Sequence, residues 1–133
     1  MKKTLSLLLV MLSLFSVFAV GVSASDIGIQ PLWDNTGMIS CRVYVDTDGY
    51  GYAESDVLGH FSSNKIKVDV IVYEKNGSDW EYVGEDHVTA DANYCFTSYQ
   101  FDISDGAIYK ADFTFTVTKN GVDEVIEKTC YSE

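Results

Sequence analysis

The chain has 133 residues, with 20 acidic against 9 basic side chains and a net charge of −11. A surface this acidic repels phosphate and anionic headgroups, which excludes nucleic acid as a partner and disfavours membrane surfaces. The length fits one compact domain after a leader.

Residues 1–24 have the pattern of a secretory signal peptide. Two lysines precede an apolar run from Leu5 to Val20, and the small residues Val22-Ser23-Ala24 follow. We expect cleavage after Ala24, because this is where a signal peptidase reads small side chains. A retained membrane anchor is the alternative, but the run is at or below the roughly 17–25 residues that a helix needs to cross a bilayer. The pattern predicts a secreted protein that is free of the membrane once cleaved.

The remainder divides into a tail, residues 25–36, and one β domain, residues 37–133. Apolar and polar residues alternate as in half-buried strands, and no stretch keeps a helical period. In chain order, strands are expected at 38–46, 50–58, 65–74, 80–88, 92–103, 109–117 and 122–131. The clearest inward-facing sets are Ile66, Val68, Val70 and Val72, then Tyr109, Ala111, Phe113, Phe115 and Val117; Ile39, Cys41, Val43 and Val45 are expected to share one face of the first strand.

Turn dipeptides separate these segments. Asp48-Gly49, Asn76-Gly77 and Asn120-Gly121 are typical hairpin turns, and Asp105-Gly106 turns the chain once more. About seven short strands with regular turn signals are typical of an antiparallel sandwich or barrel. The fold class predicted is therefore all-β.

The three cysteines are Cys41, Cys95 and Cys130. An odd number in an exported chain indicates one disulfide and one free thiol, or no disulfide at all. Cys41 and Cys130 could pair if the first and last strands are neighbours, but the sequence leaves the pairing open.

The segment from Asp105 to Ala111 resembles the D-x-A-x-Y-x-C stretch that opens the sixth strand of immunoglobulin domains. The resemblance implies that Tyr109 forms a tyrosine corner, with its hydroxyl bonded back to the turn. Ala111 stands where that family has its second core cysteine, so the usual disulfide between the sheets is absent at this position.

More broadly, the chain resembles small secreted immunoglobulin-like proteins of Gram-positive bacteria. The corresponding pieces are a leader, Ile29-Gln30-Pro31, the segment from Asn76 to Trp80, and the segment from Gly106 to Tyr109. This resemblance implies a seven-strand immunoglobulin-like sandwich and an extracellular location, and it implies no activity.

Two sets of residues raise the question of a metal site. Asp46 and Asp48 resemble the start of a Ca²⁺ loop, but such a site needs six to eight oxygen ligands and a hairpin turn explains the same residues. His60 and His87 have no second ligand at metal spacing, so we expect loop or surface histidines there. No metal or other cofactor is predicted.

Exposed aromatic residues offer the best candidate ligand site. Tyr50 and Tyr52 share one face of a strand, and Trp80 lies beside a turn. Aromatic rings in such places can stack on sugars, whereas the alternative is that they only cover the ends of the core.

Catalytic patterns are missing from the sequence: there is no G-x-S-x-G elbow, and a pairing of Cys95 with His87 lacks a third, orienting group. We therefore predict a non-enzymatic, monomeric binding or interaction domain with an unidentified extracellular or cell-envelope partner. The alternatives are a carbohydrate-binding module and a small secreted inhibitor or immunity-type protein.

Overall fold

The computed structural model describes residues 33–133, which form seven antiparallel strands and no helix. The strands are β1 (Thr36–Val45), β2 (Tyr50–Gly59), β3 (Ser63–Asn76), β4 (Asp79–Ala90), β5 (Tyr94–Asp102), β6 (Tyr109–Lys119) and β7 (Val122–Tyr131). The prediction of an all-β chain is confirmed. The expected signal peptide, its cleavage after Ala24 and the Ile29-Gln30-Pro31 segment lie outside the described residues. Within residues 33–133, no helix is long and apolar enough to cross a bilayer.

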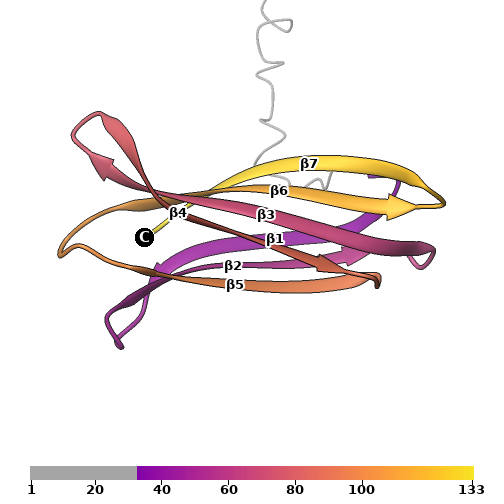
Figure 1. Cartoon of the computed structure of the whole chain (residues 1–133), viewed down its shortest axis with the longest axis horizontal. Helices are drawn as coiled ribbons and strands as arrows, with labels where there is room; N and C mark the ends of the chain where they lie inside the picture. Colours follow the sequence, from indigo (N-terminus) through magenta and orange to yellow (C-terminus); the bar gives the residue numbers. More distant parts are fainter. Residues whose placement is uncertain (1–32) are drawn as a thin grey trace, which may run out of the picture. The chain divides into compact units, whose positions relative to one another are not determined.

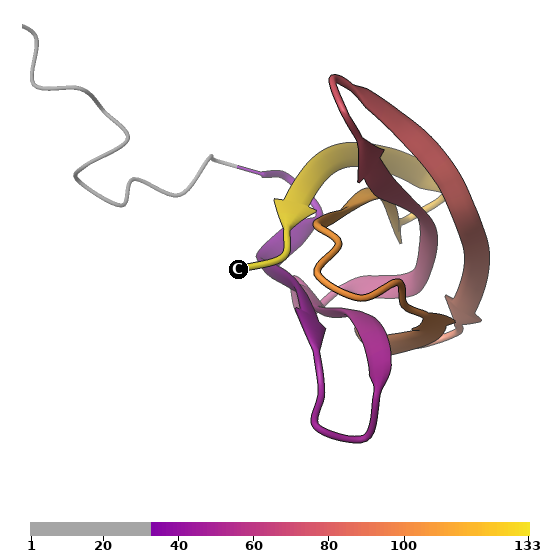
Figure 2. The same ribbon diagram turned by 90° about the vertical axis from the view of Figure 1, so that its left-hand side faces the viewer.

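The strands form two sheets that face each other as a sandwich (Figure 1). One sheet has the order β1-β2-β5 and the other β4-β3-β6-β7; we call them the 1-2-5 sheet and the 4-3-6-7 sheet. Seen along the strands, the β1–β2 and β3–β4 hairpins project to opposite sides (Figure 2).

The placement of β4 departs from the constant-type immunoglobulin order, in which the fourth strand joins the first, second and fifth. Here β4 pairs with β3, from Ile66 opposite Ala90 to Asn76 opposite Asp79. The Asn76-Gly77 turn explains this, because a tight hairpin keeps two consecutive strands in one sheet.

The core lies between the sheets and is richest on the 4-3-6-7 side. The predicted inward residues of β3 and β6 are all at most 1% exposed: Ile66, Val68, Val70, Val72, Tyr109, Ala111, Phe113, Phe115 and Val117. Burial of each large apolar side chain stabilises the fold by about 1.5–3 kcal/mol. The expectation that Val45 shares the buried face of β1 is wrong. Val45 is 46% exposed, because it is the last residue of β1 and lies beyond the packed layer.

The hairpin turns adopt the backbone that their sequences indicate. Asn120 and Gly121 both have positive φ, 53° and 75°, which is the type I′ geometry that matches the twist of paired strands. Replacing Gly121 by any residue with a side chain would strain this turn.

The first and last strands are joined along one side of the sandwich, which we call the seam. A Cys41–Cys130 disulfide crosses it, and Val43 makes a parallel bridge to Ser132. At the start of β1, the Asn35 amide donates to the carbonyl oxygens of Val117 and Val122, at 2.9 Å each. The seam therefore ties the three-stranded sheet to the four-stranded one.

Glu124 on β7 secures the same end of the seam. It accepts hydrogen bonds from Asp34 N at 2.7 Å, Asn35 N at 3.1 Å and Thr36 Oγ1 at 2.7 Å. Burial alone would raise the pKa of Glu124, but these bonds to the charged form outweigh it and lower the pKa from its ordinary value.

Candidate binding surfaces

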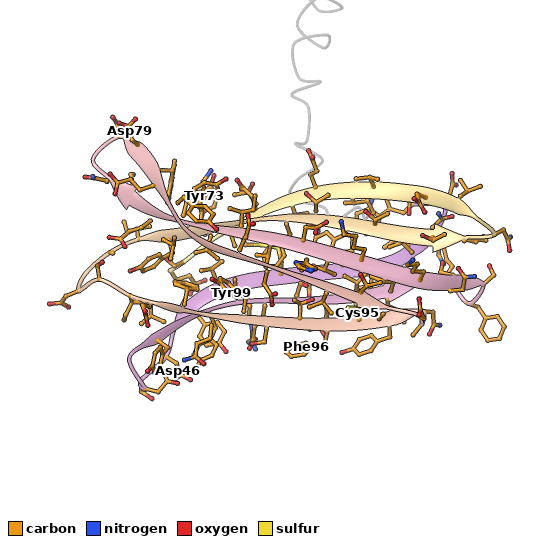
Figure 3. All side chains as sticks on the ribbon, in the orientation of Figure 1. Asp46, Tyr73, Asp79, Cys95, Phe96 and Tyr99 are labelled. Atoms are coloured by element: carbon orange, nitrogen blue, oxygen red, sulfur yellow. A yellow bond between two sulfur atoms is a disulfide. The ribbon has the colours of Figure 1, made fainter. Side chains whose placement is uncertain are left out.

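The outer side of the 1-2-5 sheet, which we call the 1-2-5 face, gathers large side chains that the core does not use. Alternation along β1, β2 and β5 sends every second residue outward, and the register aligns these residues in rows across the strands. Figure 3 shows Phe96 pointing away from the sandwich on this side. No other described strand covers this face.

One end of the 1-2-5 face is apolar. Met38 lies opposite Leu58, which in turn lies opposite Tyr94, and the three are 42%, 40% and 49% exposed. Phe96 stands one row further along, also 49% exposed. Neighbouring apolar side chains left in water mark an interaction surface more often than isolated ones do. We call these residues the apolar end.

The centre of the face is a hydrogen-bonded network around Glu54. Its carboxylate accepts bonds from Arg42 Nε at 2.8 Å and Nη2 at 2.5 Å, from the Tyr44 hydroxyl at 3.0 Å and from Ser98 Oγ at 3.2 Å. Burial alone would raise the pKa of Glu54, but these donors, Arg42 foremost, lower it. The same bond raises the pKa of Arg42. The guanidinium of Arg42 is therefore already hydrogen-bonded and ion-paired to Glu54.

The other end of the face carries tyrosines. The rings of Tyr44 and Tyr52 stack with centroids 5.5 Å apart, and Tyr50 is 40% exposed. The Tyr52 hydroxyl donates to Asp48 Oδ2 at 2.6 Å, and this bond, together with burial, raises the pKa of Tyr52 to about 12. Tyr50 and Tyr52 lie together as the sequence suggests, and Tyr44 is an additional member.

The carboxylates of the β1–β2 turn are occupied by local hydrogen bonds. Asp46 Oδ1 accepts from Thr47 N at 2.7 Å, and Asp48 Oδ1 accepts from Tyr50 N at 3.0 Å. Residues 33–133 contain no cluster of three or more His, Cys, Asp or Glu side chains placed to hold a metal ion. Asp46 and Asp48 thus act as turn-forming residues in this structure.

Trp80 is not brought together with Tyr50 and Tyr52, because β4 belongs to the other sheet. It packs against Tyr131 with ring centroids 6.0 Å apart, and Lys110 Nζ lies 5.2 Å from its centroid and 4.8 Å from that of Tyr73. Such cation–π contacts stabilise by about 0.5–1 kcal/mol at exposed sites. Sequence reasoning missed Tyr73, Lys110 and Tyr131, since their proximity depends on the strand order.

A groove of about 610 Å³ runs along the seam, between Tyr44 on β1 and Tyr131 on β7. Its walls include Tyr44 from the 1-2-5 sheet and Tyr131 from the 4-3-6-7 sheet, and the Cys41–Cys130 disulfide lines it. The groove therefore offers a tyrosine on either side of a concave surface.

The other residues that the sequence singled out are Tyr109, His60, His87 and Cys95. The Tyr109 hydroxyl accepts a bond from Ser104 N at 2.6 Å, which is the geometry of a tyrosine corner. His60 Nε2 lies 3.1 Å from Trp33 O, and His87 faces Asp69 across β3 and β4. Cys95 is a free, buried thiol, and burial raises its pKa.

The outward position of each residue of the apolar end could have been found from the sequence, although their adjacency depends on the strand order. Met38, Leu58, Tyr94 and Phe96 occupy positions of outward parity, where an ordinary solvated strand has polar residues. Phe61, in the loop after β2, is 100% exposed and gives a further apolar group near the end of that strand.

Comparisons with known proteins give only distant structural likenesses. No family model and no curated protein sequence matches the chain. Among solved structures, R. palustris CsgH is 15% identical with a TM-score of 0.39, covering 71% of this chain and 90% of its own. The E. coli curli protein CsgC is 15% identical with a TM-score of 0.41, and the likeness covers 69% of this chain and 95% of CsgC.

A third likeness is to Parabacteroides merdae β-glucuronidase, 12% identical with a TM-score of 0.43, covering 73% of this chain but 13% of the enzyme. All three TM-scores are low. Likenesses at this level carry no information about the function of this chain.

Proposed function

We propose that the protein is a non-enzymatic binding domain that works outside the cytoplasm and engages its partner through the 1-2-5 face. The observation that carries this proposal is the apolar end, where Met38, Leu58, Tyr94 and Phe96 are each 40–49% exposed in adjacent rows. Leaving these groups in water costs free energy that a partner would recover on covering them.

The disulfide and the leader both support an extracytoplasmic location. Disulfides such as Cys41–Cys130 persist in oxidising compartments and are rare in the cytosol. The predicted signal peptide would deliver the chain to such a compartment. A partner in the medium or the cell envelope fits both features.

The test is affinity capture from spent medium and envelope fractions with the mature chain, residues 25–133, as bait. A double variant, Leu58→Ser with Phe96→Ser, removes apolar surface from the 1-2-5 face. Its matched control is Val122→Ser with Val125→Ser on β7, where the two valines are 65% and 61% exposed.

We expect the face variant to lose the captured partner and the control to retain it, with both giving unchanged circular dichroism. Equal capture by the wild type and the face variant would contradict the proposal.

The seam groove supports a second candidate function, saccharide binding. Tyr44 and Tyr131 line opposite walls of one groove, and aromatic faces stack on the apolar faces of sugar rings. Tyr131→Ala is the test variant, because Tyr131 is 60% exposed and its loss leaves the core intact. A glycan array would show hits that disappear in this variant; an array without hits would remove the candidate.

A further inference from the structure

We propose that the partner of the 1-2-5 face is a cationic polypeptide segment that carries Lys or Arg side chains together with apolar ones. This inference rests on the proposed function and adds the chemistry of the partner. It follows from how charge and apolar surface are combined on this face.

The face has more carboxylates than cations. The ion pairs within residues 33–133 are Arg42–Glu54, Lys67–Asp69 and Lys110–Asp112. Arg42 is the only basic residue on the strands of the 1-2-5 sheet, and it is already held by Glu54. Asp56 and Asp102 therefore form no ion pair within residues 33–133, and Arg42, the nearest cation on the sheet, is bonded to Glu54.

The other sheet cannot supply the missing charge. Every lysine in the described part of the chain belongs to β3, β6 or β7, in the other sheet: Lys65, Lys67, Lys75, Lys110, Lys119 and Lys128. Lys128 reaches β1 at the seam, where its Nζ lies 3.5 Å from Ile39 O, and it pairs with no carboxylate. Across the thickness of a sandwich, exposed charges are largely screened at physiological salt. A cation for Asp56 has to come from a partner.

Asp56 lies beside the apolar end. It stands opposite Phe96, and its Oδ1 accepts a bond from the Tyr94 hydroxyl at 2.7 Å. Leu58 is two residues along the same strand, about 7 Å away. A lysine or arginine can pack its aliphatic stem on such apolar groups while its charged head reaches the carboxylate. One partner side chain can satisfy both features.

Asp102 extends the same chemistry to the tyrosine end. It lies opposite Tyr50, which is 40% exposed. Leu58 and Tyr50 are at opposite ends of β2, about 27 Å apart at 3.3–3.4 Å per residue. An extended or helical polypeptide can span this distance and place a cation at each end.

Other occupants fit the face less well. A second copy of the chain would bring Asp56 and Asp102 of both copies onto one interface, and like charges in such a position cost affinity. Anionic lipid is repelled for the same reason. A neutral saccharide could donate hydroxyl hydrogen bonds to these carboxylates, but it would bring no positive charge to neutralise them.

The experiment uses the mature chain and two synthetic peptides of equal length, one alternating Leu with Lys and the other alternating Leu with Glu. Calorimetry measures affinity, and amide shifts in NMR spectra locate the bound peptide. We expect the Lys peptide to bind with shifts on β1, β2 and β5, and the Glu peptide not to bind. Added salt should weaken binding, because exposed ion pairs are screened.

Charge variants separate a specific site from general attraction to an acidic protein. Asp56→Asn with Asp102→Asn removes two charges from the face. Glu85→Gln with Glu127→Gln removes the same number from exposed positions on the other sheet. We expect the first pair to weaken binding about five- to tenfold, as for two exposed ion pairs, and the second to change it less than twofold.

Equal weakening by both pairs, binding of the Glu peptide, or no binding of the Lys peptide would overturn the inference. Concentration-dependent dimerisation that Phe96→Ser abolishes would overturn it in favour of a second copy. If the apolar variants lose the natural partner in the capture experiment while the Lys peptide does not bind, the proposed function stands and only the cationic partner is wrong.

Discussion

The two sheets differ on both of their sides. The inner side of the 4-3-6-7 sheet is packed with large apolar groups such as Phe113 and Phe115, while its outer side mixes lysines, threonines and carboxylates with exposed apolar groups such as Tyr82, Val125 and Tyr131. The 1-2-5 sheet has smaller and more polar residues inside, including Ser55 and Thr97, and leaves Phe96 and its apolar neighbours outside.

The 4-3-6-7 sheet supplies most of the apolar core, whereas the binding surface that we propose belongs to the 1-2-5 sheet. The well-filled inner side of the 4-3-6-7 sheet contributes most of the buried apolar surface. The 1-2-5 sheet is held in place by the seam and by its contacts with that core. The outer side of the 1-2-5 sheet can therefore expose apolar groups without any loss of core packing.

Removing the disulfide tests this division with the largest expected effect. Cys41→Ala with Cys130→Ala should lower the free energy of unfolding by about 2–5 kcal/mol. The disulfide joins residues that are 89 positions apart in the sequence, so it closes a long loop in the unfolded chain. Denaturant titration measures the loss. Hydrogen exchange should speed up in β1 more than in β3 and β6; equal acceleration in both sheets would contradict the role given to the seam.

Tyr109→Phe tests the connection that leads from β5 in one sheet to β6 in the other. Loss of the bond from Ser104 N to the Tyr109 hydroxyl should cost about 1–2 kcal/mol, the usual effect of leaving a buried polar group unpaired. Tyr73→Phe is the control, since Tyr73 is only half-buried on an outer face. Identical melting of the two variants would rule out a stabilising tyrosine corner.

Acid should weaken the fold through one carboxylate on the 1-2-5 face and one at the seam. Glu54 and Glu124 both have a folded-state pKa below the ordinary 4.5. Their contribution to the free energy of unfolding is present above pH 4.5 and is lost as the pH falls through the lowered pKa values. Melting temperature against pH should show this drop, and Glu124→Gln should make it shallower. A drop beginning near pH 6 would point to other groups.

The smallest effect is expected on the inner side of the 1-2-5 sheet. The hydroxyls of Ser55 and Thr97 face each other across β2 and β5 and have no hydrogen-bond partner. Ser55→Ala with Thr97→Val should be neutral or stabilising, within about 1 kcal/mol, because unpaired buried hydroxyls are replaced by apolar groups. A loss above about 2 kcal/mol would show that these hydroxyls are bonded in solution.

The sequence alone was sufficient for the strands, for their inward faces apart from Val45, and for their hairpins. Ile66, Val68 and Val70 alternate with Lys65, Lys67 and Asp69. Asn120-Gly121 forms a turn that few other dipeptides can adopt. These features depend on neighbours within one or two strands, and a period of two or a positive φ is visible in the order of residues.

Only the tertiary structure decided which distant residues meet. It set the strand orders β1-β2-β5 and β4-β3-β6-β7, separated Trp80 from Tyr50 and Tyr52, joined Cys41 to Cys130, and assembled the apolar end from three strands. The physical reason is that sheet order and register are set by packing across the whole core. Alternation says that a residue points outward, but it does not say which other outward residues lie beside it.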